Sequence, residues 1–278
     1  MSGTRAVPLT LCNFRDFGGV VCADGHVLPT GLLFRSEAPA LDAEDDVAHL
    51  QRLGVRTFVD LRSPEEVLSF PAGLAESGSY VRAGLRRVGW EDRDVPQERM
   101  SDFLAERYLR LAEEGLREDR PMGRALSALM EPSRTGRIVW CAGGKDRTGI
   151  VVALFLHLLG VSHEDIAADY ARSAQAAVEL RRRARRKTAT RAAVTRTRDP
   201  AERRRELRAS AAAFPGGLGA LANPAPAEAI TLFLAELARR HGGIQQYAVR
   251  AGLGTAAVTE IKQALFGVIA TQPSSSTA

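Results

Sequence analysis

The chain has 278 residues, 45% of them hydrophobic, which is enough for the core of one large domain or of two small ones. It shows no charged and apolar leader with a cleavage site and no apolar run of membrane-spanning length, so we expect a cytoplasmic protein, with export without a signal peptide left open. Three cysteines, Cys12, Cys22 and Cys141, are too few for a disulfide framework. A bridge between Cys12 and Cys22 is the alternative to two reduced, partly buried thiols, which we expect.

The net charge of +5 is unevenly distributed along the chain. The segment Arg181–Arg208 holds 13 basic and three acidic residues, so its net charge is +10 and that of the remaining chain is −5. Such a segment can bind an acidic partner. It contains no aromatic residue on which bases could stack, so an anionic lipid fits better as such a partner than nucleic acid does.

The N-terminal third alternates between strand and helix patterns, which favours an α/β sheet with helical covers. Arg15 and Arg35 lie in the first two strands, where they either reach an anionic site or pair with Asp16 or another carboxylate. The pairing is the preferred interpretation. The predicted strands are Asn13–Val20 with its turn, Leu32–Ser36, Val55–Arg62 and Tyr80–Gly89, and the predicted helix is Asp42–Leu53.

Two polar residues, Asp60 and Arg62, lie at the C-terminal end of the third predicted strand. Ligands of open α/β sheets bind at the carboxyl ends of the strands, so both residues are site candidates. For Asp60, a role as a cap or salt-bridge partner is equally expected. Ser63 and Pro64 follow as the N-cap and first position of a helical turn that is acidic at Glu65 and Glu66.

The rest of the chain is predominantly helical. Ser162 and Asp165 resemble a capping box, with Asp in place of Glu. The two charged segments that follow carry only a thin apolar stripe, so we expect them to dock weakly, as a cover. The predicted helices are Ser101–Glu114, Arg124–Met130, Gly149–Leu159, Asp169–Thr188, Pro200–Phe214, a helix ending at Gly242–Gly243 and Ala256–Val268. Residues 271–278 are expected to be a disordered tail.

The stretch Ile138–Gly149 reads as a buried strand, a glycine-rich loop and the start of an apolar helix. Cys141 opens the loop at the end of the strand. The helix N-terminus and the loop N–H groups favour negative charge there, both as a thiolate and as bound substrate oxygens. Arg147 presents a planar fork that matches two phosphoryl oxygens, and Thr148 can donate to the sulfur.

The remaining loop residues fit the same interpretation. Gly143 and Gly144 let the backbone curl so that its N–H groups point inward. Asp146 follows Lys145 directly, where a nucleotide-binding P-loop requires Ser or Thr, so the run is not of that kind. The predicted phosphate-binding residues are Ala142, Gly143, Gly144, Lys145, Asp146, Arg147 and Thr148.

The run Cys141–Gly149 resembles the signature of the Cys-x5-Arg protein tyrosine phosphatases. The stretches around Asn13–Val20, Phe34–Ser36 and Val59–Ser63 are similar to a bacterial, lid-bearing branch that includes mycobacterial tyrosine phosphatase B and a Listeria lipid phosphatase. The resemblance implies one phosphatase domain over residues 1–270, built on a mostly parallel four- or five-stranded sheet flanked by helices. It also implies a helical lid at about 163–222.

The resemblance assigns roles to individual residues. Cys141 is the nucleophile that forms a phosphocysteine, and Arg147 clamps the phosphoryl group. Lys145 adds a cation, as in relatives that accept phosphoinositides. Asp146 is the general acid or base, with Asp60 as the competing or assisting carboxylate. A third alternative places the acid at Asp92 or Asp94, in a polar loop over 90–96 that only superficially resembles the acid loop of better-known tyrosine phosphatases.

One position departs from the family pattern, because Trp140 replaces the usual histidine before the cysteine. That histidine supports the loop and the thiolate, so we expect slower catalysis from a working enzyme. The leading hypothesis is therefore hydrolysis of phosphotyrosine, with phosphoserine/threonine or phosphoinositide as further substrates and with no metal or organic cofactor. A non-catalytic phosphate-binding module and anionic-partner binding through Arg181–Arg208 are the alternatives.

Overall fold

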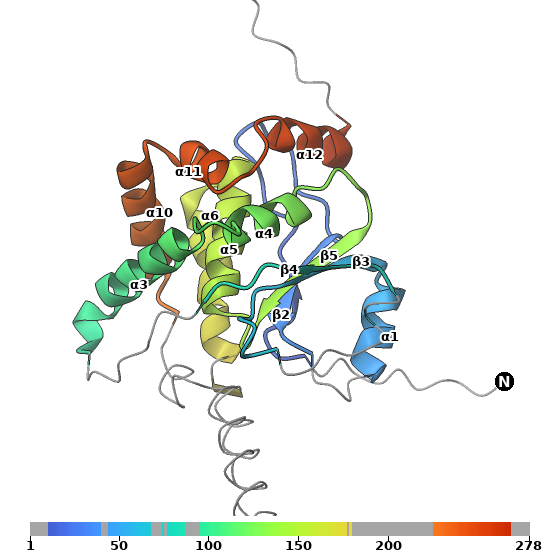
Figure 1. The fold of residues 1–278 in the computed structure, drawn as a ribbon, viewed down its shortest axis with the longest axis horizontal. Coiled ribbons are helices and arrows are strands. Elements are labelled where there is room, and N and C mark those ends of the chain that lie inside the picture. The colour runs from blue at the N-terminus through green and yellow to red at the C-terminus, as the bar shows by residue number, and fades with distance from the viewer. Residues whose placement is uncertain are drawn as a thin grey trace, which may run out of the picture.

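A five-stranded, mostly parallel sheet organises the protein, as expected from the sequence (Figure 1). The computed structural model describes residues 11–39, 44–67, 74, 77–86, 95–176, 178–179 and 225–267. The strand order is β1-β2-β5-β3-β4, and only β1 is antiparallel to its neighbour. The strands are β1 (Arg15–Asp16), β2 (Leu33–Glu37), β3 (Val55–Asp60), β4 (Ser79–Arg82) and β5 (Gly136–Cys141).

Helices cover both faces of this sheet. One face is covered by α1, and the opposite face by the buried helix α5 and the helices packed around it (Figure 1). The helices are α1 (Glu44–Arg52), α3 (Met100–Glu114), α4 (Pro121–Leu129), α5 (Asp146–Leu158), α6 (His163–Ala171), α10 (Ala227–His241), α11 (Ile244–Arg250) and α12 (Ala257–Phe266), with a 3₁₀ turn η1 at Gln97–Arg99.

The central strand β5 divides the core into two clusters. All six of its residues are buried, and the four from Ile138 to Cys141 form the continuous apolar run that is typical of a parallel strand. Val139 and Cys141 face the larger cluster, around α5, whereas Ile138 and Trp140 face the smaller one, on the side of α1. Because side chains alternate along a strand, the nucleophile candidate and its unusual neighbour lie on opposite faces of the sheet.

The start of the predicted cover belongs to the body of the protein, which corrects the expectation of weak docking there. Ser162 caps α6 by accepting a hydrogen bond from the Asp165 N–H at 3.1 Å, as predicted. Asp169, Tyr170 and Ser173 are then buried, because the first two turns pack against α5 and α10. The helix α6, with which the predicted lid starts, therefore packs against the body of the protein.

Several other predictions fall on residues outside the described ranges. These are most of the lid at 163–222, the segment Arg181–Arg208, the loop with Asp92 and Asp94, and the tail at 271–278.

The sequence pattern also missed α11, a short helix directly after Gly243. Cys12, Cys22 and Cys141 are buried and form no disulfide among the described residues. None of the helices within the described ranges has the length and apolar character that a bilayer span requires.

Candidate active site

Cys141 ends the central strand, and the loop that follows it leads directly into α5. Its side chain is 4% exposed. The strand is fixed on both sides, by β2 and by β3. Beyond the strand, the Cys141 carbonyl accepts a hydrogen bond from the Ala38 N–H at 2.9 Å. The thiol is thus held at the carboxyl edge of the sheet, beside a helix N-terminus.

The backbone of the loop is bent sharply at Gly144, where φ is +63°. A Cβ atom there would lie 2.3 Å from the carbonyl oxygen of Ser36, so only glycine fits. The side-chain amide of Asn13 donates to the Gly144 carbonyl at 2.7 Å, and the Arg35 guanidinium donates to the same carbonyl at 2.8 Å. The Gly144 carbonyl is thus held by two donors from outside the loop, which fixes the bend of the loop.

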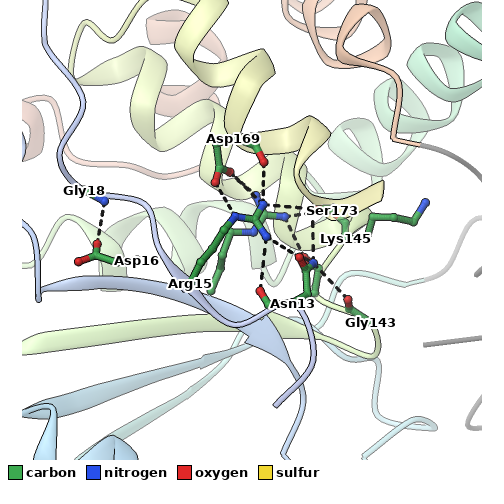
Figure 2. A network of polar contacts seen from close by, with 10 residues as sticks. Asn13, Arg15, Asp16, Gly18, Gly143, Lys145, Asp169 and Ser173 are labelled. Carbon is green, nitrogen blue, oxygen red and sulfur yellow. Dashed lines mark hydrogen bonds and ion pairs between the residues drawn. The ribbon is translucent and has the colours of Figure 1, made fainter. Parts of the chain in front are cut away.

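The supporting residues are themselves fixed by Asp169 in α6 (Figure 2). Its carboxylate accepts from Arg15 at 2.7 Å and from Arg35 at 2.6 Å. Burial alone would raise the pKa of Asp169, but the two guanidinium groups lower it below its usual value. Burial and the neighbouring Arg35 lower the pKa of Arg15 to about 10, so Arg15 remains charged at neutral pH. The predicted carboxylate pairing of Arg15 and Arg35 is confirmed, with Asp169 and not Asp16 as the partner.

Arg147, in the first turn of α5, is held by Glu66. The Nη2 of Arg147 donates to Oε1 of Glu66 at 2.8 Å, and Nη1 donates to Oε2 of Glu66 and to the Leu61 carbonyl. Burial would lower the pKa of Arg147, but Glu66, Cys141 and Asp146 together raise it above its usual value. Among the described residues, Nε of Arg147 donates to no protein acceptor, so one edge of the guanidinium is left for a ligand.

Asp146 and Lys145 interact with each other at the entry to α5. The Nζ of Lys145 donates to Oδ1 of Asp146 at 3.0 Å. The same oxygen accepts from the hydroxyl of Tyr108 at 2.7 Å. The Lys145 side chain is 2% exposed and that of Asp146 is 21% exposed. Of the two carboxylates predicted for acid–base chemistry, Asp146 is thus the one in the loop itself and open to solvent.

Asp60 lies on the other face of the sheet. It is paired with Trp140 in the ladder between β3 and β5, so its side chain points away from the face that carries Cys141. Its carboxylate accepts four hydrogen bonds from Arg62 side-chain and backbone donors at 2.6–3.1 Å and one from the Tyr80 hydroxyl at 2.9 Å. Asp60 therefore lies on the face opposite to Cys141 and forms an ion pair with Arg62, as its alternative role as a salt-bridge partner requires.

Unpaired polar atoms occur in one residue of the signature and in the residue directly before it. Thr148 Oγ1 and Trp140 Nε1 are both buried without a hydrogen-bond partner in the described part of the chain. The Thr148 hydroxyl is thus available to a thiolate at Cys141, the role expected of it. Trp140 packs against Phe58, with ring centroids 6.2 Å apart, and so does not occupy the space of the loop.

No group of three or more His, Cys, Asp or Glu side chains at metal-binding distance occurs among the described residues. The remaining predicted phosphate-binding positions, Ala142 and Gly143, lie within the loop, and Gly143 is buried there. The side-chain amide of Asn13 lies 3.4 Å from the Gly143 carbonyl. The loop thus combines a thiol, a helix N-terminus and one fixed guanidinium, which together suit a phosphate dianion.

Comparison with known proteins agrees with this geometry. Residues 9–267 match the model of the tyrosine phosphatase family. The chain belongs to this family. The resemblance drawn from Cys141–Gly149 is thereby confirmed, and the five-stranded sheet agrees with the fold that it implied.

Three curated relatives carry related names. A protein of Cupriavidus necator, named as a candidate tyrosine-protein phosphatase, is 34% identical over 178 residues, which are 60% of this chain and 62% of the relative. A tyrosine-protein phosphatase of Nostoc commune is 32% identical over 137 residues, 48% of this chain and 44% of the relative. The triple specificity protein phosphatase PtpB of Mycobacterium tuberculosis is 30% identical over 198 residues, 62% of this chain and 70% of the relative. The chain thus spans less than two thirds of the length of the first two tyrosine phosphatase relatives.

Sequence reasoning missed the residues that support the tyrosine phosphatase loop from outside. Glu66 was assigned to an acidic helix turn, and no role was given to Asn13, Tyr108 or Asp169. A signal for Glu66 did exist, since a buried arginine requires a carboxylate partner. The sequence could not say which of its many carboxylates approaches Arg147.

Proposed function

We propose that this member of the tyrosine phosphatase family hydrolyses phosphotyrosine monoesters through a phosphocysteine intermediate. The observation that carries the proposal is the position of Cys141 at the end of β5, beside the N-terminus of α5 and within the field of Arg147. A thiolate there has both a nucleophilic sulfur and a cradle for the phosphoryl oxygens.

In the first step, the thiolate of Cys141 attacks phosphorus, so that an S–P bond forms while the bond from phosphorus to the phenolic oxygen breaks. The departing oxygen takes a proton from Asp146, which lies in the loop and is partly open to solvent. Arg147 and the loop N–H groups hold the three equatorial oxygens as charge redistributes among them.

In the second step, water attacks phosphorus and the S–P bond breaks. Asp146, now ionised, takes the proton from that water, and the sulfur leaves as a thiolate. The Thr148 hydroxyl, which is buried and has no acceptor in the described residues, donates to this sulfur. The two steps release the phenol and inorganic phosphate and regenerate the starting protonation state.

Phosphotyrosine is favoured over a phosphoinositide by the state of Lys145. Its ammonium group is buried and bound to Asp146, so a second phosphate of an inositol headgroup would have to draw it out of that contact. Contact with anionic lipid through Arg181–Arg208 is a separate proposal, supported by the net charge of +10 alone. Vesicle binding that is unaffected by high salt would argue against that electrostatic contact.

The test is a kinetic panel of phosphotyrosine peptide, phosphoserine peptide and a phosphoinositide, with the Cys141→Ser variant as control. We expect phosphate release from the phosphotyrosine peptide with the highest kcat/KM, and none above background from Cys141→Ser. A Cys141→Ser variant with full activity would exclude the phosphocysteine mechanism. An inactive wild-type protein that still binds inorganic phosphate would instead support the non-catalytic module.

A further inference from the structure

Three residues from three different helices form a buried hydrogen-bonded chain that ends on Asp146. The Tyr108 hydroxyl in α3 bonds to Oδ1 of Asp146 at 2.7 Å, and the Tyr170 hydroxyl in α6 bonds to the Tyr108 hydroxyl. The rings of Tyr108 and Tyr170 meet edge to face, with centroids 6.0 Å apart, and each residue is 1% exposed. These hydrogen bonds therefore connect two tyrosines in the core of the protein to the partly exposed carboxylate of Asp146.

The direction of each hydrogen bond follows from the chemistry of its ends. An ionised carboxylate only accepts, so Tyr108 must donate its single proton to Asp146. Tyr170 must then donate to the oxygen of Tyr108. Burial, followed by the charge of Asp146, raises the pKa of both hydroxyls well above the usual tyrosine value, so both keep their protons at neutral pH.

The hydrogen bond from Tyr108 makes the two carboxylate oxygens of Asp146 different from each other. Oδ1 accepts from Tyr108 and from Lys145, whereas Oδ2 has no partner among the described residues. A proton carried by Asp146 is therefore directed to Oδ2, because Oδ1 already faces two donors. A carboxyl held in this way cannot rotate to exchange its oxygens without breaking both bonds.

A glycine of the catalytic signature makes room for this chain. A Cβ atom at Gly149 would lie 2.9 Å from Cδ2 of the Tyr170 ring. The last glycine of the signature thus lets Tyr170 pack directly on α5, one turn from Asp146. The two tyrosines thus contact the signature at two positions, Gly149 by packing and Asp146 by a hydrogen bond.

We propose that Tyr108, supported by Tyr170, is a positioning residue that holds Asp146 with Oδ2 toward the leaving group and keeps the proton on that oxygen. The proposal rests on the proposed phosphatase function. It predicts that loss of the Tyr108 hydroxyl weakens proton donation specifically, while nucleophilic attack by Cys141 and binding of the phosphoryl group persist.

The experiment compares Tyr108→Phe with wild type on two aryl phosphates, p-nitrophenyl phosphate and phenyl phosphate. The phenolate of the second is a much poorer leaving group and needs the acid more. We expect kcat for phenyl phosphate to fall about ten- to a hundredfold and kcat for p-nitrophenyl phosphate to fall less than about threefold.

Tyr247→Phe is the matched control, since Tyr247 is also fully buried and donates its hydroxyl to a backbone carbonyl, that of Ala112, at 2.8 Å. It should leave both rates unchanged.

Tyr170→Phe keeps the bond from Tyr108 to Asp146, so kcat for phenyl phosphate should fall only about two- to threefold, and kcat for p-nitrophenyl phosphate should fall less. This variant provides a test if Tyr108→Phe does not fold.

The outcomes separate the two proposals. If Tyr108→Phe lowers both substrates equally, or behaves as Tyr247→Phe does, Tyr108 has only a structural role and the positioning inference is wrong. If wild type is inactive on both substrates or Cys141→Ser is active, the proposed function itself is wrong. A selective loss on phenyl phosphate, in a folded variant of an active enzyme, supports both.

Discussion

Glu66 holds the guanidinium of Arg147 from behind, with one carboxylate oxygen on each terminal nitrogen. The pair is buried, with side-chain exposures of 2% and 7%. Two parallel hydrogen bonds of this kind fix both the position and the plane of the arginine. The edge that carries Nε is thereby aimed away from Glu66, and a phosphoryl group can be bound without reorganising the side chain.

Replacing Glu66 by Gln should lower kcat about ten- to a hundredfold and weaken competitive inhibition by inorganic phosphate. The amide keeps the volume of the carboxylate but offers one acceptor in place of two and no charge, so the Arg147 fork loses its fixed plane. Steady-state kinetics on a phosphotyrosine peptide measure both effects. The neighbouring Glu65 is exposed, and Glu65→Gln should leave them unchanged. Equal activity of the two variants would contradict the role of Glu66.

Gly144→Ala should reduce turnover more than a hundredfold, because the new Cβ atom would meet the Ser36 carbonyl oxygen at 2.3 Å in a backbone region that alanine disfavours. The loop must move, and its N–H groups then lose their common centre. Phosphate release and thermal unfolding, measured together, separate a local from a global effect. Gly254→Ala is the control, as no atom lies within 4 Å of its Cβ position. Unchanged turnover in Gly144→Ala would show that the loop tolerates another shape.

Asp169→Asn should destabilise the protein by about 3 kcal/mol at neutral pH, because Arg15 and Arg35 would lose their shared buried anion. Asp169 has a pKa below its usual value in the folded state, so its contribution is present above the unfolded-state pKa of about 4 and is lost as pH falls through the folded-state value. Wild type should therefore converge on the variant as pH falls from 6 to 3. Urea unfolding across this range measures the difference.

Glu236 provides the control for Asp169, because it also has a lowered pKa, of about 2, caused by hydrogen bonds from Arg239 and Arg240. That cluster lies at the surface, where solvent screens the charges. Glu236→Gln should change stability far less than Asp169→Asn. A comparable loss in both variants would mean that burial does not set the strength of the Asp169 contacts.

The sequence predicted the strand, loop and helix around Cys141 well because each of their signals is local. A buried strand, glycines, an arginine and an apolar helix follow one another within Ile138–Leu158, and the structure has them in that order. The same holds for the capping residue Ser162 and for the helices α1 and α3, whose apolar periodicity is complete within each segment.

The supports of the loop could not be predicted because they depend on how distant segments meet. Glu66 and Arg147 are 81 positions apart, and Arg15 and Asp169 are 154 apart. Each of these residues looks like an ordinary surface charge in its own segment. Asp60 shows the converse: its place at a strand end suggested a catalytic group, and only the register of β3 against β5 reveals that it faces the other side.

The contacts around Asp169 have a consequence for biosynthesis. Asn13 and Arg35, which hold the outside of the loop, emerge first during translation, but Asp169 and Ser173, which fix Arg15, are made more than twenty residues after Arg147. Domains generally fold as units, so this set of contacts forms only when all of its segments have been made. A nascent chain that includes Arg147 but not yet Asp169 already contains Cys141, but the residues that fix the phosphate-binding loop are incomplete. We therefore expect the loop to bind phosphate only after α6 has been made and has packed against α5.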